Sequence, residues 1–198
     1  MSWIDQGGLM TWPLLALSVT VLAVLFDRAI VFSTLRLPDV ETENALLAAL
    51  EVKDKKVACS MVKDDFPFIL PLVEALAADQ SATVRECDAA IRIEEAIRLL
   101  DRRVEWLALA SRVAPLMGLL GTIVGIIVTF SHMSEARGGV DMSSLAEGIW
   151  QALIATAIGL CIAIPSVLAH HGFHRCEESV AFALNRFANR ALVRGKKE

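Results

Sequence analysis

The first 27 residues of the chain contain no lysine or arginine. A secretory signal peptide begins with a basic segment and ends at a small-residue cleavage site. This N-terminus carries Asp5 instead, and bulky residues follow its apolar run. We therefore exclude a cleaved signal peptide and expect residues 9–33 to be retained as a membrane anchor.

Polar residues are scarce, because 55% of the chain is hydrophobic and its mean hydropathy is +0.54. This composition excludes an ordinary soluble domain. A helix needs about 20 mostly apolar residues to cross a bilayer, and three stretches are long enough. We predict an all-α membrane protein with three transmembrane helices, of which the second and third extend into the cytoplasm. The expected segments are a periplasmic N-terminus (1–8), a first span (9–33), a cytoplasmic helical domain (34–103), a second span (104–133), a periplasmic turn (134–144), a third span (145–173) and a cytoplasmic helical tail (174–198).

The orientation follows from the lack of basic residues on one side of the predicted membrane. Ten lysines and arginines lie between Thr34 and Glu105 and six follow Phe173, but the short turn has only Arg137. Basic residues near the ends of spans stay in the cytoplasm. The N-terminus is therefore expected to be periplasmic and the C-terminus cytoplasmic.

Cysteine is also rare, and no two cysteines have CxxC spacing. Three of the four are expected to face the reducing cytosol, and Cys161 lies in the third span. We predict free thiols and no disulfide bonds.

Three histidines cluster at the expected cytoplasmic end of the third span. His170, His171 and His174 have the i, i+3 and i, i+4 spacing that can bind zinc. No acid or cysteine cluster completes a site before Cys176 and Glu177. We therefore expect no metal and no cofactor.

The long loop between the first two spans has few helix breakers and predicts helices. One is expected over residues 40–63, a short one after Pro71, and a third from near Thr83. No glycine or proline interrupts residues 84–114, so the third helix should run directly into the second span. The third span should likewise continue as an amphipathic helix. Its predicted apolar stripe is Val180, Phe182, Leu184, Phe187 and Leu192. The charges on these long helices form either a solvated face or the lining of a cytoplasmic vestibule.

Small residues recur every three or four positions in the second and third spans. On the second span they are Pro115, Gly118, Thr122, Gly125 and Thr129, and we give Gly121 the same role. On the third span they are Gly148, Ala152, Thr156, Gly159, Ala163 and Ser166. Such faces pack helices together in lipid. Two interpretations stay open: the two faces join these helices into a hairpin, or they surround a helix inserted from another chain. In the first, Thr122 and Thr156 bond to carbonyls one turn back. In the second, their hydroxyls line a polar path.

Pro115 and Pro165 are expected to kink their helices.

The middle of the second and third spans lacks Asp, Glu, Lys and His. Ion relays through membranes normally use such groups, so a titrating carboxylate would have to come from a partner. Asp27 and Arg28 lie in the inner half of the first span, where we expect them to reach the interface or pair with Arg112. Glu147 lies at the outer end of the third span, one turn before Gln151.

The runs Ala-Pro-Leu-Met-Gly-Leu-Leu-Gly-Thr-Ile-Val-Gly-Ile (114–126), Ala-Leu-Ile-Ala-Thr-Ala-Ile-Gly-Leu (152–160) and Ala-Ile-Pro (163–165) resemble the MotA, TolQ and ExbB proton channel family. The resemblance covers residues 104 to 189. Three spans and the absence of a larger motor-type domain favour the ExbB and TolQ branch over MotA. The Asp27-Arg28 pair is similar to that of ExbB-type chains.

The resemblance implies a homopentamer in the inner membrane of a Gram-negative bacterium, enclosing single helices of an ExbD-like or TolR-like partner. That partner would carry the membrane aspartate, and proton flow would drive movement passed to a TonB-like or TolA-like protein. Thr122 and Thr156 match the family's pore threonines. Gln151 departs from the glutamate that relatives commonly have there, and Glu147 stands where they have proline. A titratable role at Gln151 is therefore in doubt.

Two other function classes were weighed. A non-conducting membrane scaffold would use the small faces for assembly alone. An intramembrane hydrolase would need a His or Asp partner at helical spacing from a membrane serine, and the sequence has none. We expect no enzymatic activity and no nucleic-acid partner.

Overall fold

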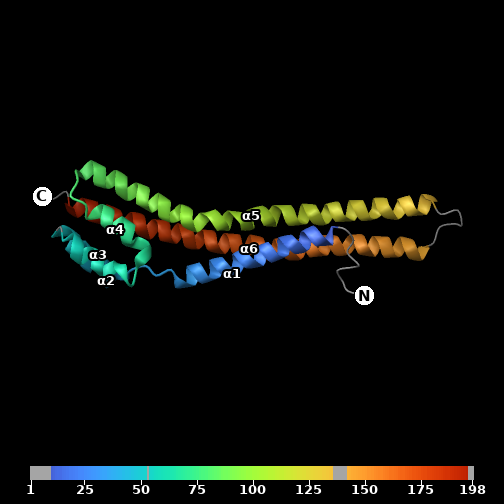
Figure 1. Cartoon of the computed structure of the whole chain (residues 1–198), viewed down its shortest axis with the longest axis horizontal. Coiled ribbons are helices and arrows are strands. Elements are labelled where there is room, and N and C mark those ends of the chain that lie inside the picture. Colours follow the sequence, from blue (N-terminus) through green and yellow to red (C-terminus); the bar gives the residue numbers. More distant parts are fainter. Residues whose placement is uncertain (1–9, 53, 136–141, 196–198) are drawn as a thin grey trace. The chain divides into compact units, whose positions relative to one another are not determined.

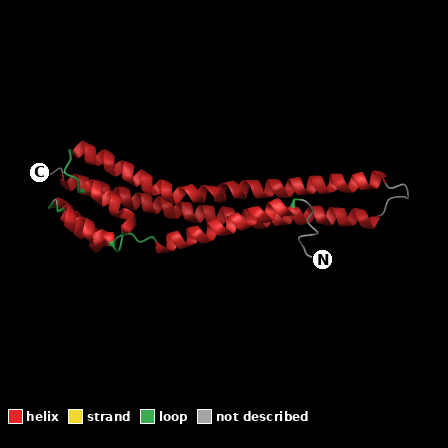
Figure 2. Ribbon diagram, viewed as in Figure 1, coloured by secondary structure: helices red, strands yellow, loops and turns green. Residues whose placement is uncertain are grey.

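The computed structural model describes residues 10–52, 54–135 and 142–195. In these ranges the chain is helical and contains no strand (Figures 1 and 2). The elements are α1 (Thr11–Thr34), α2 (Val40–Glu51), α3 (Lys55–Lys63), the 3-10 turn η2 (Pro67–Ile69), α4 (Leu70–Leu76), α5 (Ala82–Glu135) and α6 (Met142–Gly195). The all-α class is confirmed.

Three helices are long and apolar enough to cross a membrane, as predicted. They are Thr11–Thr34, Ala82–Ser134 and Leu145–Gly195, each with a strongly apolar 18-residue window. The expected periplasmic N-terminus and most of the expected turn between α5 and α6, with Gly138 and Gly139, lie outside the described residues.

Contacts divide the chain into two compact units. Unit 1 comprises Met1–Arg28 and Arg103–Gly172, and unit 2 comprises Ala29–Arg102 and Phe173–Glu198. Each of α1, α5 and α6 therefore contributes one end to each unit. Unit 1 contains the threonines and the small-residue motifs, and unit 2 contains α2, α3 and α4.

The core of unit 2 is built from apolar side chains of all its helices. Its buried members include Leu46, Leu47, Val62, Val73 and Leu184. The α6 positions in this core are Val180, Leu184, Phe187 and Ala188, which recur at helical spacing. Phe182 was wrongly placed in this stripe and is 70% exposed. It lies about 200° around the helix from both Val180 and Leu184.

The helix predicted over residues 40–63 is two helices, α2 and α3, and Asp39 and Asp54 cap their N-termini. Asp39 Oδ1 accepts a hydrogen bond from Thr42 N at 3.0 Å, and Asp54 Oδ1 accepts one from Val57 N at 3.2 Å. Hydrogen bonds from Thr42, chiefly from its side chain, hold the pKa of Asp39 below its usual value. The cap at Asp54 starts a second helix, although the continuous periodicity predicted a single unbroken one. The break lets both helices contribute to one core.

A buried carboxylate joins α2 to α6 in unit 2. Glu43 is 5% exposed, and its oxygens accept hydrogen bonds from Arg186 Nη2 at 2.9 Å and Arg190 Nη1 at 2.6 Å. Arg190 also donates to Asn44 Oδ1 at 3.2 Å. A buried charge is tolerated only when it is paired and hydrogen-bonded. Two guanidinium groups meet that condition here.

Glu43→Gln should lower the thermal midpoint of the protein in mild detergent, because it removes the charge and keeps the shape. Hydrogen bonds to charged groups contribute about 1.5–3 kcal/mol to stability, so we expect the free energy of unfolding to fall by an amount in that range. The control is Glu51→Gln, whose partner Arg194 lies 3.5 Å away between partly exposed side chains. A surface pair of this kind contributes about 0–1 kcal/mol. Equal midpoints for the two variants would contradict the role of Glu43.

Candidate functional site

The backbones of α5 and α6 touch in unit 1 at glycine positions. A Cβ added to Gly159 would lie 2.6 Å from the Ala114 carbonyl oxygen and 3.2 Å from the Gly118 Cα. A Cβ added to Gly118 would lie 3.0 Å from the Thr156 Cα. Real Cβ atoms essentially never come closer than 3.0 Å to another atom, so the 2.6 Å distance at Gly159 rules out a side chain there. Only glycine therefore permits this approach at Gly159.

The other small residues continue the same contact along the two helices. Gly125 faces Ala152, and Gly148 faces the Thr129 side chain. Gly121 faces Ala155 of α6 and also Met10, just before α1. Of the two interpretations of the small faces, the structure supports the hairpin at these positions: the faces bury each other.

The two threonines use their hydroxyls differently. Thr156 Oγ1 donates to the Gly118 carbonyl oxygen of the other helix at 3.0 Å. Thr122 Oγ1 donates to the Leu119 carbonyl oxygen of its own helix at 2.7 Å. The expectation that both bond one turn back is therefore wrong for Thr156. A hydroxyl has one donor and two acceptor lone pairs, so each threonine has lone pairs left to accept a further hydrogen bond.

The remaining predicted residues of α5 and α6 occupy ordinary helical positions. Pro115 and Pro165 lie inside continuous helices, one partly buried and the other exposed. Glu147 is exposed, and Gln151 is partly buried. Gln151 lies about 140° around α6 from Thr156, so the two side chains have different neighbours.

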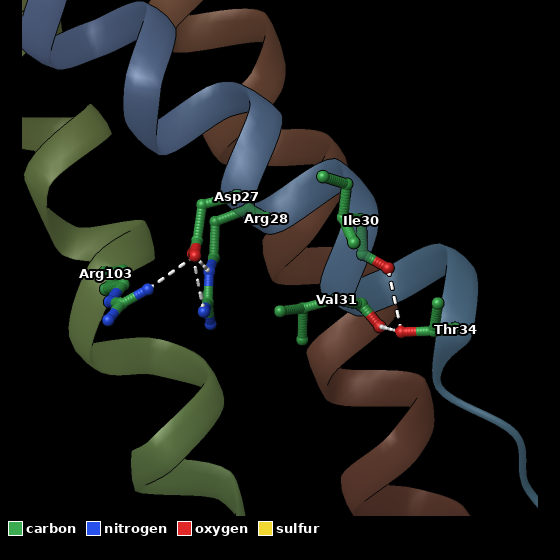
Figure 3. Close-up of polar contacts among 6 residues, drawn as sticks. All are labelled: Asp27, Arg28, Ile30, Val31, Thr34 and Arg103. Atoms are coloured by element: carbon green, nitrogen blue, oxygen red, sulfur yellow. Dashed lines mark hydrogen bonds and ion pairs between the residues drawn. The ribbon is translucent and has the colours of Figure 1, made fainter.

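Asp27 and Arg28 of α1 form an ion-pair cluster with Arg103 of α5, shown in Figure 3. Arg28, which is 5% exposed, donates through Nε to Asp27 Oδ2 at 2.8 Å. Arg103 Nη1 donates to Asp27 Oδ1 at 2.5 Å. The prediction that this pair binds Arg112 is therefore wrong. It lies nine residues, or two and a half turns, further along α5 than Arg103.

Arg112 instead lines a cavity between α5 and α6 of about 390 Å³. The polar groups of its lining are Ser111 and Arg112 from α5 with His170 and His171 from α6. His174 points elsewhere: its Nδ1 lies 3.4 Å from Glu177 and its Nε2 lies 3.7 Å from Glu178. Within the described ranges, no three His, Cys, Asp or Glu side chains are grouped to hold a metal ion.

Comparison with known proteins matches residues 69–185 to the MotA/TolQ/ExbB proton channel family. The chain belongs to this family. It is 30% identical over 168 residues to Biopolymer transport protein exbB1 of Vibrio cholerae, covering 82% of this chain and 74% of that protein. It is 33% identical over 168 residues to a putative ExbB-like biopolymer transport protein of Synechocystis, covering 82% and 66%. It is 43% identical over 89 residues to the Tol-Pal system protein TolQ of Haemophilus influenzae, covering 45% and 38%.

The matched region of this proton channel family member includes all the glycines and threonines of the α5–α6 contact in unit 1. Sequence reasoning found the glycines and threonines of that contact from their spacing. It missed Arg103, and it did not connect Ser111 and Arg112 with the histidines. Helical spacing could have indicated the second of these groups. Ser111 lies eleven residues before Thr122 and His170 lies fourteen after Thr156, so each lies on nearly the same helix face as its threonine.

Gly159→Ala should destabilise the α5–α6 pair by about 1–3 kcal/mol, the usual cost of overpacking, because the new methyl group would meet a backbone carbonyl. Gly172→Ala is the matched control on the same helix, since nothing lies within 4 Å of its added Cβ. Alanine favours a helix over glycine by about 1 kcal/mol, so the control should be neutral or slightly stabilised. Thermal unfolding in detergent measures both. A Gly159→Ala variant as stable as the control would refute the contact.

Proposed function

We propose that this chain is an ExbB-like subunit of a proton-driven stator in the inner membrane of a Gram-negative bacterium. It works with an ExbD-like single-span partner. Together they convert proton motive force into movement that acts on a TonB-like protein for outer-membrane uptake. The names of the Vibrio and Synechocystis relatives, both biopolymer transport proteins, support this assignment.

One observation carries the proposal: the hydroxyls of the two predicted pore threonines lie in spans without an acid or base. Residues 113–130 of α5 and 149–169 of α6 include Thr122 and Thr156 but no Asp, Glu, Lys or His. A neutral hydroxyl orients a proton but cannot store one. The carboxylate that binds and releases protons therefore belongs to the partner.

The hydrogen bonds of the threonines suggest which form of that carboxylate they favour. Both hydroxyls donate to backbone carbonyls and offer only lone pairs to a ligand. Lone pairs accept from a protonated carboxyl group and repel an ionised one. To solvate a carboxylate, Thr122 or Thr156 must first give up its backbone bond. The threonines as placed here thus stabilise the neutral acid while it passes.

The proposed assembly is a homopentamer, as the family resemblance implies. The small faces of α5 and α6 do not require it, because they bury each other. Large apolar side chains cover the outside of the pair and must meet lipid or another copy. On α5 they include Leu116, Leu119, Leu120, Ile123, Ile126 and Ile127, all exposed.

The proposed orientation has the N-terminus in the periplasm and the C-terminus in the cytoplasm. The distribution of basic residues supports it. Trp12, Trp106 and Trp150 are all exposed, as expected of residues at the two membrane interfaces.

A TolQ-like role is the second candidate. The identity of 43% to TolQ of Haemophilus influenzae over 89 residues favours it. In that case the partner is TolR-like and the driven protein TolA-like. A non-conducting scaffold is the third, and proton flux separates it from the first two.

Reconstitution of this chain in liposomes tests the proposal. Three preparations are compared: the chain alone, the chain with the ExbD-like or TolR-like protein encoded beside it, and the same pair with the partner's membrane Asp changed to Asn. Proton flux should appear only in the second, because only that pair has a membrane carboxylate. Flux from the chain alone, or unchanged flux with the Asn partner, points to Glu147 or Asp27 and contradicts the proposal. Absence of flux from every preparation favours the scaffold.

Thiol labelling tests the orientation. A membrane-impermeant maleimide should label the exposed Cys87 and Cys176 in inverted vesicles and leave them unlabelled in right-side-out vesicles. Cys59 should react more slowly than either near pH 7, because burial, aided by Glu74, raises the pKa of its thiol and lowers the thiolate fraction. Raising the pH should narrow this difference. Labelling of Cys87 and Cys176 in right-side-out vesicles, and not in inverted ones, would contradict the proposed orientation.

A further inference from the structure

The cavity lined by Ser111, Arg112, His170 and His171 continues the faces that carry the threonines. Eleven residues separate Ser111 from Thr122, which leaves them about 20° apart around α5. Fourteen residues separate Thr156 from His170, which leaves them about 40° apart around α6. Ser111 and His170 therefore lie on nearly the same sides of α5 and α6 as the threonines, with small residues, among them Gly118 and Gly159, between them.

The two histidines are the titratable groups of that cavity. Their ring centroids lie 5.6 Å apart, and His171 is exposed. Arg112 is the charged side chain that α5 contributes. The α1 residues Ser18, Val21, Leu22 and Leu25 line a separate pocket against α6 that does not include the histidines, and the ion-paired Asp27 and Arg28 follow on the same helix. His174 and its partners Glu177 and Glu178 follow on α6 itself.

Imidazole suits proton transfer, since each ring nitrogen can bind or release a proton. Arg112 contributes a fixed positive charge that repels inorganic cations. The cavity thus has groups that exchange protons and a charge that discourages other cations. An anion site would use the same charge but would not need two adjacent imidazoles.

We propose that His170 and His171 form the proton-release station at the cytoplasmic end of the path, a proposal that rests on the proposed function. The partner's carboxylic acid loses its O–H bond as an imidazole nitrogen gains the proton, directly or through water. The imidazolium then gives the proton to cytosolic water or buffer and returns to the neutral ring. No electron transfer is involved, and the carboxylate is left ready for the next proton.

The test uses the complete complex of this chain with its partner in liposomes. The His170→Gln/His171→Gln double variant should conduct protons about tenfold more slowly than wild type. This is less than the hundredfold or more that a general base can contribute, because water can partly replace it. Adding imidazole buffer on the side of these residues should restore the flux. Wild-type flux should depend on the pH of the cytoplasmic side, and flux through the double variant should depend on it less.

His174→Gln is the matched control, since His174 lies one turn further along α6 and outside the cavity. It should keep wild-type flux and pH dependence. Wild-type flux and an unchanged pH profile in the double variant would overturn the release station. A loss of flux that imidazole does not restore would also overturn it, and would indicate a structural or anion-binding role. The wild-type complex and the complex with the partner's Asp changed to Asn are measured in the same experiment. Their comparison tests partner-dependent conduction, and the histidine variants test the release station separately.

Discussion

Unit 1 depends on the approach of Gly159 to the backbone of α5. No Cβ fits between Gly159 and the Ala114 carbonyl. The two helices can therefore come close enough for Thr156 to reach the Gly118 carbonyl at 3.0 Å. That bond fixes the hydroxyl as a donor to the hairpin and leaves its lone pairs for a ligand. A larger residue at this point would separate the helices and move the threonine with them.

Much of this arrangement could be predicted from the sequence, because small residues at helical spacing identify a packing face in lipid. Spacing could not say which helix would fill that face, so the hairpin and the inserted helix stayed open. It also could not reveal contacts between distant residues. Arg103 meets Asp27 from 76 positions away, and Glu43 meets Arg186 and Arg190 from 143 and 147. The break between α2 and α3 was missed because the cap at Asp54 is a local hydrogen bond inside an otherwise helical pattern.

The absence of acids from the α5 and α6 spans has a physical logic. A carboxylate in hydrocarbon is costly, and one fixed in the wall would hold its proton in one place. Under the proposed function, a moving partner carries the charge between sites instead, and hydroxyls in the wall exchange hydrogen bonds with it at each stop. Charged residues are then needed only where the path meets water, which is where Arg112 and the histidines lie under the proposed orientation.

The central claim is that a positioned hydroxyl, and not merely a small side chain, serves the proton path at Thr156. Partner-dependent flux through Thr156→Ser and Thr156→Val complexes tests it most directly. Serine keeps the hydroxyl, and valine keeps the shape without it. Flux should be nearly wild type with serine and strongly reduced with valine, and both complexes should assemble. Equal flux through the two variants would contradict it and would leave Thr156 as a packing residue alone.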